Sequence, residues 1–162
     1  MIREANIEDS EILAEIISES FKDVAQRFLL TPENCPKHPS NYTASWVESD
    51  FERGVRYFIL YQDNTPVGCA GLEIPGQDVC YLERLSVLPE MRGNHFGVDL
   101  FRHTINCAES NGISKVSIGI IDEQADLKEW YRNLGFIVTG TKSFPHLPFT
   151  VCFMELGLNA NE

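Results

Sequence analysis

The feature that most constrains this chain is a strand that ends abruptly and is followed at once by a helix. An apolar run reaches Val87, Leu88 and Pro89, a turn with Gly93 and Gly97 follows, and a helical pattern then continues to position 110. Such a turn aims several backbone N–H groups at a phosphate, and the positive end of the helix adds to the attraction. The segment has neither the Gly-Lys-Ser/Thr of a P-loop nor the three-glycine spacing of a dinucleotide fingerprint. It therefore predicts a phosphorylated cofactor that is held in another way.

Composition and charge narrow the class of protein. The chain has 162 residues, 43% of them hydrophobic, and no linker or repeat, which predicts one domain over residues 1–162. Asp and Glu number 24 against 13 Lys and Arg, a net charge of -11. This charge opposes binding to nucleic acid, and we expect no nucleic-acid partner. An acidic surface suits a cationic amine, although a need for solubility explains the charge equally well.

The cysteines and the chain start indicate the compartment. The five cysteines are scattered, without a Cys-x-x-Cys pair, and predict buried, reduced thiols and no metal site. The chain begins with the charged Arg3 and Glu4, and no apolar run approaches the 18 or so residues of a membrane span. We therefore expect a cytoplasmic location and no membrane partner.

Hydrophobic periodicity and turn residues predict an alternation of strands and helices. Short turns at 63–64 and 75–78 join three successive strands and predict an antiparallel meander. The expected helices cover about 7–21, 43–53, 96–110 and 123–133, and the expected strands cover about 2–5, 55–62, 66–74, 79–88, 115–121, 136–142 and 149–156.

Two separated motifs resemble those of the GNAT superfamily of N-acetyltransferases. The first is V-L-P-E-M-R-G at 87–93 within V-L-P-x-x-R-G-x-x-x-G, and the second is W-Y-R-N-L-G-F at 130–136. Their order and spacing agree with the family over nearly the whole chain. The resemblance implies an α/β fold of the mixed α+β kind. It has about seven mostly antiparallel strands, splayed between strands 4 and 5, and about four flanking helices.

The resemblance implies acetyl-coenzyme A as the co-substrate. The loop that matches the family's pyrophosphate site binds mainly through its backbone, and the preceding strand offers its backbone to the pantetheine arm. The residues implied to bind the coenzyme are Leu85, Ser86, Val87, Arg92, Gly93, Asn94, His95, Phe96, Gly97, Gln124 and Leu127.

His95 departs from the family pattern, which usually has glycine there. Glycine suits a backbone that approaches the phosphates closely or takes a positive φ, and histidine is among the residues that tolerate this conformation. Its ring either points to solvent or adds a donor beside the phosphates. The departure bears on the tightness of coenzyme binding.

Two residues are candidates for proton transfer. Tyr131 matches the tyrosine that often protonates the departing thiolate in the superfamily, and the alternative is a core tyrosine. Glu83 is the candidate base, because an alkyl amine with a pKa near 10 must lose a proton before it attacks. Period-two geometry places Glu83 on the face of Leu85 and Val87, or on the opposite face where a bulge intervenes. The alternative for Glu83 is a solvent-facing or ion-paired carboxylate, beside Arg84 or Arg102.

The resemblance places the acceptor pocket between the segments 28–42 and 144–150. The pair Cys35-x-x-His38 lacks the further ligands of a tetrahedral metal site and fits a structural loop better. The candidate substrate-binding residues are His38, Asn41, Tyr42, Glu73, His146 and Phe149. The predicted function is transfer of an acetyl group to the primary amine of a small molecule by direct attack. Acetylation of a protein or peptide amine, a non-catalytic acyl-CoA-binding module, a longer acyl donor and a homodimer stay open.

Overall fold

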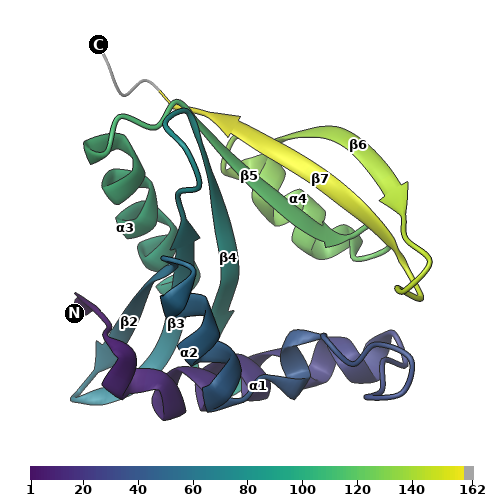
Figure 1. The fold of residues 1–162 in the computed structure, drawn as a ribbon, viewed down its shortest axis with the longest axis horizontal. Helices are drawn as coiled ribbons and strands as arrows, with labels where there is room; N and C mark the ends of the chain where they lie inside the picture. The colour runs from purple at the N-terminus through teal and green to yellow at the C-terminus, as the bar shows by residue number, and fades with distance from the viewer. Residues whose placement is uncertain (159–162) are drawn as a thin grey trace.

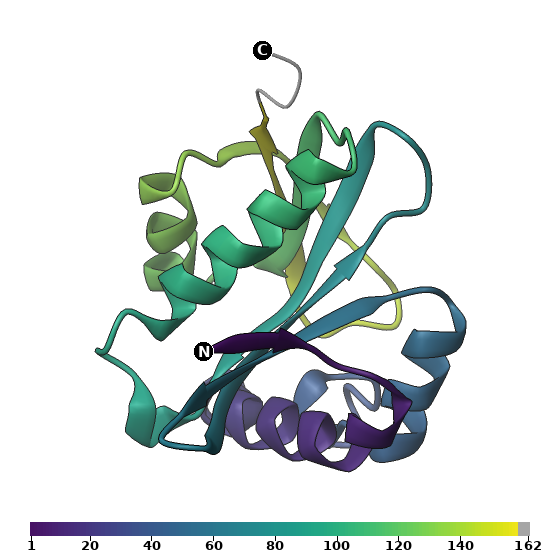
Figure 2. The same cartoon turned by 90° about the vertical axis from the view of Figure 1, so that its left-hand side faces the viewer.

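A computed structural model describes residues 1–158. One seven-stranded sheet has the order β1-β2-β3-β4-β5-β7-β6 and carries helices on both faces (Figures 1 and 2). None of the helices in this described part is long and apolar enough to cross a membrane. The strands are β1 (Ile2–Glu4), β2 (Arg56–Gln62), β3 (Thr65–Glu73), β4 (Val79–Val87), β5 (Lys115–Ile121), β6 (Ile137–Ser143) and β7 (Thr150–Gly157). The α-helices are α1 (Ser10–Arg27), α2 (Ala44–Glu52), α3 (Phe96–Ser110) and α4 (Ala125–Asn133), with short 3-10 turns at Ile7–Asp9, Pro39–Asn41 and Pro89–Met91.

The central strands are apolar on both faces because each face is covered by helices. In β2, Phe58 packs into the cluster formed with α3 and α4, whereas its neighbours Tyr57 and Ile59 pack into the cluster formed with α1 and α2. This alternation is the period of two of a strand. The meander β2-β3-β4 and the mixed sheet are as predicted.

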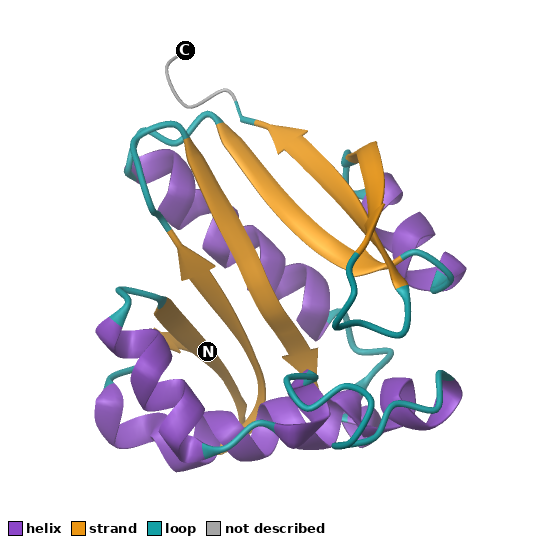
Figure 3. Ribbon diagram, turned by 45° about the vertical axis from the view of Figure 1, so that its right-hand side comes forward, coloured by secondary structure: helices purple, strands orange, loops and turns teal. Residues whose placement is uncertain are grey.

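The sheet splits between β4 and β5. These two strands pair in parallel only where Val79, Cys80 and Tyr81 meet the start of β5. Beyond Tyr81 they diverge, and α1 runs across the open end (Figure 3). The split confirms the predicted splay and leaves two strand edges with unpaired backbone groups facing each other.

A bulge changes the faces of β4. Glu83 pairs with Gly71 and Ser86 pairs with Cys69, so two residues of β4 stand opposite one residue of β3. Arg84 has a φ of +51°, in the left-handed region. The bulge therefore selects the second predicted alternative, in which Glu83 faces away from Leu85 and Val87.

The first helix is longer than predicted. It follows a 3-10 turn that Asn6 caps, and it continues to Arg27 rather than to about 21. The additional turns place Val24 and Ala25 against a third apolar cluster around Leu30. This burial outweighs the polar character of the segment, which favoured an earlier end.

Candidate active site

The split in the sheet forms a cleft of about 900 Å³ between β4, β5, α1, the first turn of α3 and one side of α4. Fourteen of the candidate residues line it, so the fold brings the two sequence motifs to one place. They are His38, Glu83, Leu85, Ser86, Val87, Arg92, Gly93, His95, Phe96, Gly97, Gln124, Leu127, Tyr131 and Phe149.

Three other candidates have structural contacts nearby. The Asn94 side chain donates to the carbonyl of Met91 at 2.9 Å, within the loop. The Asn41 side chain donates to the carbonyl of Cys35 at 3.3 Å, which stabilises the loop between α1 and α2. His146 is exposed in the loop before β7, where its ring lies 5.7 Å from that of Phe144. The cleft lining does not include these three side chains.

The loop before α3 presents a row of free backbone donors. Within residues 1–158, no acceptor is recorded for the N–H groups of residues 93–98. Five of these six residues line the cleft. Gly93 has a φ of +87° and His95 a φ of +64°, and both turn the chain so that the row ends on the first turn of α3. Unpaired N–H groups at a helix start favour a phosphate group, so the loop fits a diphosphate.

His95 adopts a left-handed backbone conformation, which glycine adopts most easily. It precedes the first residue of α3, makes no side-chain cap hydrogen bond and is exposed. Histidine can occupy the left-handed region at a modest cost. The departure from glycine therefore leaves the path of the loop intact.

The Arg92 side chain fastens this loop to α1. Its guanidinium donates to the carbonyl of Ser20 at 2.7 Å, to the carbonyl of Val87 at 3.2 Å and to the carboxylate of Asp23 at 2.7 Å. These contacts occupy the charge that could otherwise meet a phosphate. Arg92 therefore positions the loop, while the backbone N–H groups of residues 93–98 stay free within the described chain.

One buried polar atom of the cleft has no partner. The hydroxyl of Ser20, a residue that is 3% exposed and lines the cleft, makes no hydrogen bond within the described chain. A buried hydroxyl without a partner is unfavourable unless a ligand or water satisfies it. Together with the unpaired edges of β4 and β5, it fits an extended arm that carries amide groups.

Tyr131 presents its hydroxyl without an internal partner. Its ring packs against Trp130 and Phe136, with centroids 5.0 and 5.2 Å away, and the residue is 6% exposed. No hydrogen bond of its hydroxyl is recorded in residues 1–158, and Tyr131 lines the cleft. Burial raises the pKa of the phenol above its usual value, so the group stays protonated and can donate.

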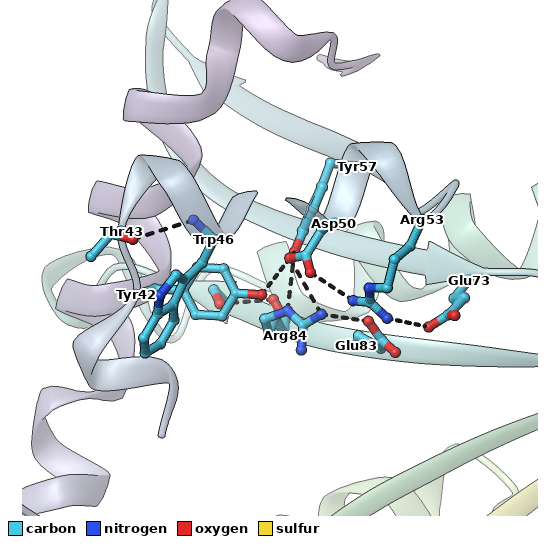
Figure 4. A network of polar contacts seen from close by, with 10 residues as sticks. Tyr42, Thr43, Trp46, Asp50, Arg53, Tyr57, Glu73, Glu83 and Arg84 are labelled. Atoms are coloured by element: carbon cyan, nitrogen blue, oxygen red, sulfur yellow. Dashed lines mark hydrogen bonds and ion pairs between the residues drawn. The ribbon is translucent and has the colours of Figure 1, made fainter. Parts of the chain in front are cut away.

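Glu83 belongs to a network of charges (Figure 4). Its carboxylate accepts from Nη2 of Arg84 at 2.5 Å and is 20% exposed. Glu73 lies diagonally across the β3–β4 pair on the same face, and Arg53 donates to it at 3.2 Å. Burial, together with the neighbouring Glu73, raises the pKa of Glu83 to about 7, although Arg84 opposes the rise. A carboxyl with this pKa can accept a proton near neutral pH.

Asp50 of α2 is the buried centre of the network. Its carboxylate accepts from the hydroxyls of Tyr42 and Tyr57 and from Arg53 at 2.6 Å, and Arg84 lies 3.5 Å away. Burial alone would raise its pKa, but these hydrogen bonds outweigh burial and lower the pKa. Asp50 is therefore a fixed negative charge. Tyr42, which was predicted to bind substrate, is one of the hydrogen-bond donors that hold this carboxylate in place.

His38 and Cys35 do not form a thiol–imidazole pair in their loop. Nδ1 of His38 accepts from the backbone N–H of Ser40 at 3.2 Å, and burial lowers the pKa of the imidazole. Cys35 is buried in the apolar cluster of Leu30 and Ile121, where burial raises the pKa of its thiol. A neutral histidine and a protonated thiol agree with a structural loop.

Sequence reasoning missed Arg84 and Asp50. Asp50 lies on the apolar stripe of α2 beside Val47, and a carboxylate in such a stripe is itself a signal of a buried charge. Arg84 was considered only as an ion-pair partner of Glu83. No local pattern indicates the bulge that aims it, because the bulge depends on pairing with β3.

The comparisons with known proteins agree with this geometry. The model of the acetyltransferase (GNAT) family matches residues 15–136. An uncharacterised N-acetyltransferase of Schizosaccharomyces pombe is 25% identical over 167 residues, covering 98% of this chain and 99% of the relative.

Solved structures share the fold. The PaiA N-acetyltransferase of Thermoplasma acidophilum, in complex with coenzyme A, has a TM-score of 0.82, 21% identity and 98% coverage of both chains. A ribosomal-protein-alanine N-acetyltransferase of Brucella melitensis has a TM-score of 0.72 and 21% identity, covering 98% of this chain and 99% of that one. The family model spans both motifs that meet in the cleft, and the chain belongs to the GNAT family of acetyltransferases.

Proposed function

We propose that this protein transfers the acetyl group of acetyl-CoA to the primary amine of a small molecule, within a single domain over residues 1–162. The observation that carries the proposal is that one cleft holds the row of free N–H groups, Glu83 and Tyr131. Bound acetyl-CoA would supply a thioester carbonyl. The chain would supply the binding, the base and the acid.

The donor side of the site is preorganised. The free N–H groups of 93–98 and the start of α3 offset the charge of a diphosphate, each charge at an exposed helix end being worth about 0.3–1 kcal/mol. Leu85, Ser86 and Val87 line the adjoining wall, with Gln124 and Leu127 on the α4 side. This set forms the proposed coenzyme site.

Glu83 is the proposed base. The ammonium of the acceptor loses a proton to the Glu83 carboxylate, and the neutral nitrogen attacks the thioester carbon to form a C–N bond. Glu73, its neighbour across β3 and β4, is the reserve base, because it faces the same side of the sheet. The raised pKa of Glu83 supports the first assignment, because a base works best when its pKa is close to the ambient pH.

Tyr131 is the proposed acid. As the C–S bond breaks, the Tyr131 hydroxyl gives a proton to the coenzyme thiolate, and the nitrogen of the new amide loses its second proton to solvent. The phenolate then recovers a proton from solvent. The absence of any recorded partner for this hydroxyl in the described residues supports the role, because nothing in that part of the chain competes for the proton. Retention of Glu83 and Tyr131 in one cleft disfavours a non-catalytic binding module.

The enclosure of the acceptor end supports a small acceptor. Leu30 and Cys35, from the loop after α1, pack with Leu147 and Phe149 from the loop before β7. Because Phe149 also lines the cleft, this packing narrows one end of the cleft and leaves less room there for a folded protein. The peptide alternative has support from the Brucella neighbour, whose name describes action on a ribosomal-protein alanine.

A thiol-release screen tests the proposal. Purified protein with acetyl-CoA is supplied with simple amines, polyamines, amino acids and short peptides, and free coenzyme A is measured. We expect release with a small amine-bearing compound, and propionyl-CoA as donor tests the length of the acyl group. Coenzyme binding without release for any acceptor would favour the binding module.

Two further proposals concern the state of the protein. We propose a cytoplasmic location, supported by five cysteines that are all free thiols in the structure. A homodimer stays a prediction, and light scattering at several protein concentrations measures it.

A further inference from the structure

We propose that Arg84 selects acceptors in which the carbon that bears the amine also bears a carboxylate or carbonyl group, as in an α-amino acid. The inference rests on the proposed function, because it concerns the acceptor of the same cleft. The chemistry is shared by a free amino acid and by the first residue of a peptide.

The guanidinium of Arg84 has donors to spare on the cleft side. Its Nε donates to the hydroxyl of Tyr57 at 3.0 Å, and its Nη2 meets Glu83 and Asp50. Nη1 has no recorded partner within residues 1–158, and Figure 4 draws one guanidinium nitrogen without a contact. Arg84 is 18% exposed and lines the cleft. The free N–H groups of Nη1 favour a carboxylate or carbonyl oxygen.

The side chain is held rigidly for such a contact. The ring of Tyr42 lies 5.1 Å from the guanidinium carbon, while Tyr57 and Asp50 fix the other side. The backbone of Arg84 has a φ of +51°, which is unfavourable for a side-chain-bearing residue. Strain of this kind persists where the surroundings impose it, and it gathers at functional sites.

His38 offers a second donor to the same cleft. Nδ1 lies 2.8 Å from the Ser40 hydroxyl and accepts from the Ser40 N–H at 3.2 Å, and we assign the proton of the neutral ring to Nε2 on the basis of the second contact. His38 is 6% exposed and lines the cleft, and no partner of Nε2 is recorded in the described chain. An N–H group that is open to the cleft and has no partner can donate to an acceptor oxygen on the ligand.

The charge pattern matches the two ends of an α-amino acid. Glu83 accepts a proton from an amine, and Arg84 next to it is always positively charged. These two side chains touch at 2.5 Å, which suits groups that are one carbon apart in the ligand. A polyamine would place a second cation near Arg84, without an oxygen for Nη1 or for His38.

The first test compares matched acceptors with the wild-type protein. Each α-amino acid is assayed beside the amine that lacks only its carboxylate, such as phenylalanine and phenethylamine, and beside its amide and a dipeptide. We expect kcat/KM to be at least about tenfold higher for the members that carry the oxygen. Activity with the free amino acid but not with the dipeptide would identify free amino acids as the acceptors. Activity with the dipeptide but not with the free amino acid would identify peptide N-termini as the acceptors.

The second test uses Arg84→Lys, which keeps the charge and loses the planar fork. We expect the preference for the oxygen-bearing acceptor to fall about tenfold, mainly in the KM of the acceptor. Arg56→Lys is the matched control, because Arg56 lies in β2, pairs with Glu4 of β1 and is outside the cleft lining. Circular dichroism and stabilisation by acetyl-CoA establish that each variant is folded.

If Arg84→Lys does not fold, product inhibition of the wild type replaces it. The N-acetyl amino acid is then expected to inhibit at a concentration at least about tenfold lower than the N-acetyl amine. Equal kcat/KM for amines with and without the oxygen would overturn this inference and leave the proposed function intact. Failure to acetylate any amine, with coenzyme bound, would overturn both.

Discussion

Glu83 and Arg84 are consecutive in β4 and project from the same face of the sheet, with Nη2 of Arg84 2.5 Å from the Glu83 carboxylate. In a regular strand two neighbours point to opposite faces, and the positive φ of Arg84 at the bulge removes this alternation. The proposed base therefore has a fixed cation beside it. The pair also lies at the centre of the charge network that α2 completes through Asp50.

The first prediction concerns the pH dependence of the rate. Glu83 must be ionised to accept a proton, and its pKa is raised to about 7. We expect kcat/KM for the amine to rise with pH through a step near 7 to a plateau, because above its pKa the Glu83 carboxylate accepts the proton of the bound ammonium. In Glu83→Gln this step should disappear, and a lower kcat/KM should keep rising towards the pKa of the amine, about 10, because only amine that is already neutral can attack. An unchanged step in this variant would assign the titration to another group.

The free energy of unfolding should also depend on the protonation of the Glu83 carboxyl. The pKa of Glu83 is about 7 in the folded protein, higher than the ordinary value of 4.5 for a glutamate, so between these pH values the folded state binds more protons. The free energy of unfolding therefore loses the contribution of Glu83 as pH rises from about 4.5 to 7. Urea unfolding at several pH values should show wild type losing stability relative to Glu83→Gln across this window. A difference in unfolding free energy between wild type and Glu83→Gln that does not change with pH would contradict the raised pKa.

The next prediction concerns Tyr131. Tyr131→Phe removes a hydroxyl for which residues 1–158 provide no recorded partner, so the melting temperature should change little. Turnover should fall about 100-fold, because loss of a general acid costs two to four orders of magnitude. Affinity for acetyl-CoA, measured by calorimetry, should stay the same. Tyr61→Phe in β2, outside the coenzyme cleft, serves as the control.

Another prediction distinguishes the hydrogen bonds of Arg92 to backbone carbonyls from its ion pair with Asp23. Arg92→Ala loses hydrogen bonds to the carbonyls of Ser20 and Val87 and should destabilise the protein by about 1–2 kcal/mol. Its affinity for acetyl-CoA should fall, because the loop is released from α1. Asp23→Ala removes only the exposed ion pair and should cost less than about 1 kcal/mol. Denaturant titration and calorimetry measure both quantities, and equal losses in the two variants would contradict the assignment.

His95 tests the left-handed turn of the loop. His95→Gly relieves the backbone at a φ of +64° and should leave coenzyme affinity unchanged. His95→Val places a β-branched residue in that region and should destabilise the protein by about 1–2 kcal/mol and weaken coenzyme binding. If the ring itself binds phosphate, glycine should weaken binding as well.

Coenzyme binding should stabilise the whole domain. Acetyl-CoA at 100 times its Kd adds about 2.7 kcal/mol, which for a chain of this size raises Tm by about 5–10 °C. Differential scanning fluorimetry with and without the ligand measures the shift. Acetate at the same concentration controls for ionic effects, and no shift with millimolar acetyl-CoA would contradict the proposed coenzyme site.

Local chemistry in the sequence was sufficient for much of the fold and for the donor side of the site. Pro89 and Gly93 end one element and turn the chain, and apolar periodicity distinguishes α3 from the strands. The motif around Tyr131 places the tyrosine on α4, one turn after Leu127, and both residues line the cleft. These features depend on residues close together in the chain, so a linear pattern carries them.

The acceptor side was decided by tertiary structure. The register between β3 and β4 creates the bulge at Arg84, and the packing of α2 on the sheet buries Asp50. Asn41, Tyr42 and His146 were predicted for the pocket from their loops, yet the described structure places their side chains outside the cleft lining. The sequence by itself determined the strand, turn and helix that present N–H groups to a diphosphate. Only the folded chain decided which charges stand beside the proposed base, because contacts between residues far apart depend on pairing and packing that no local pattern encodes.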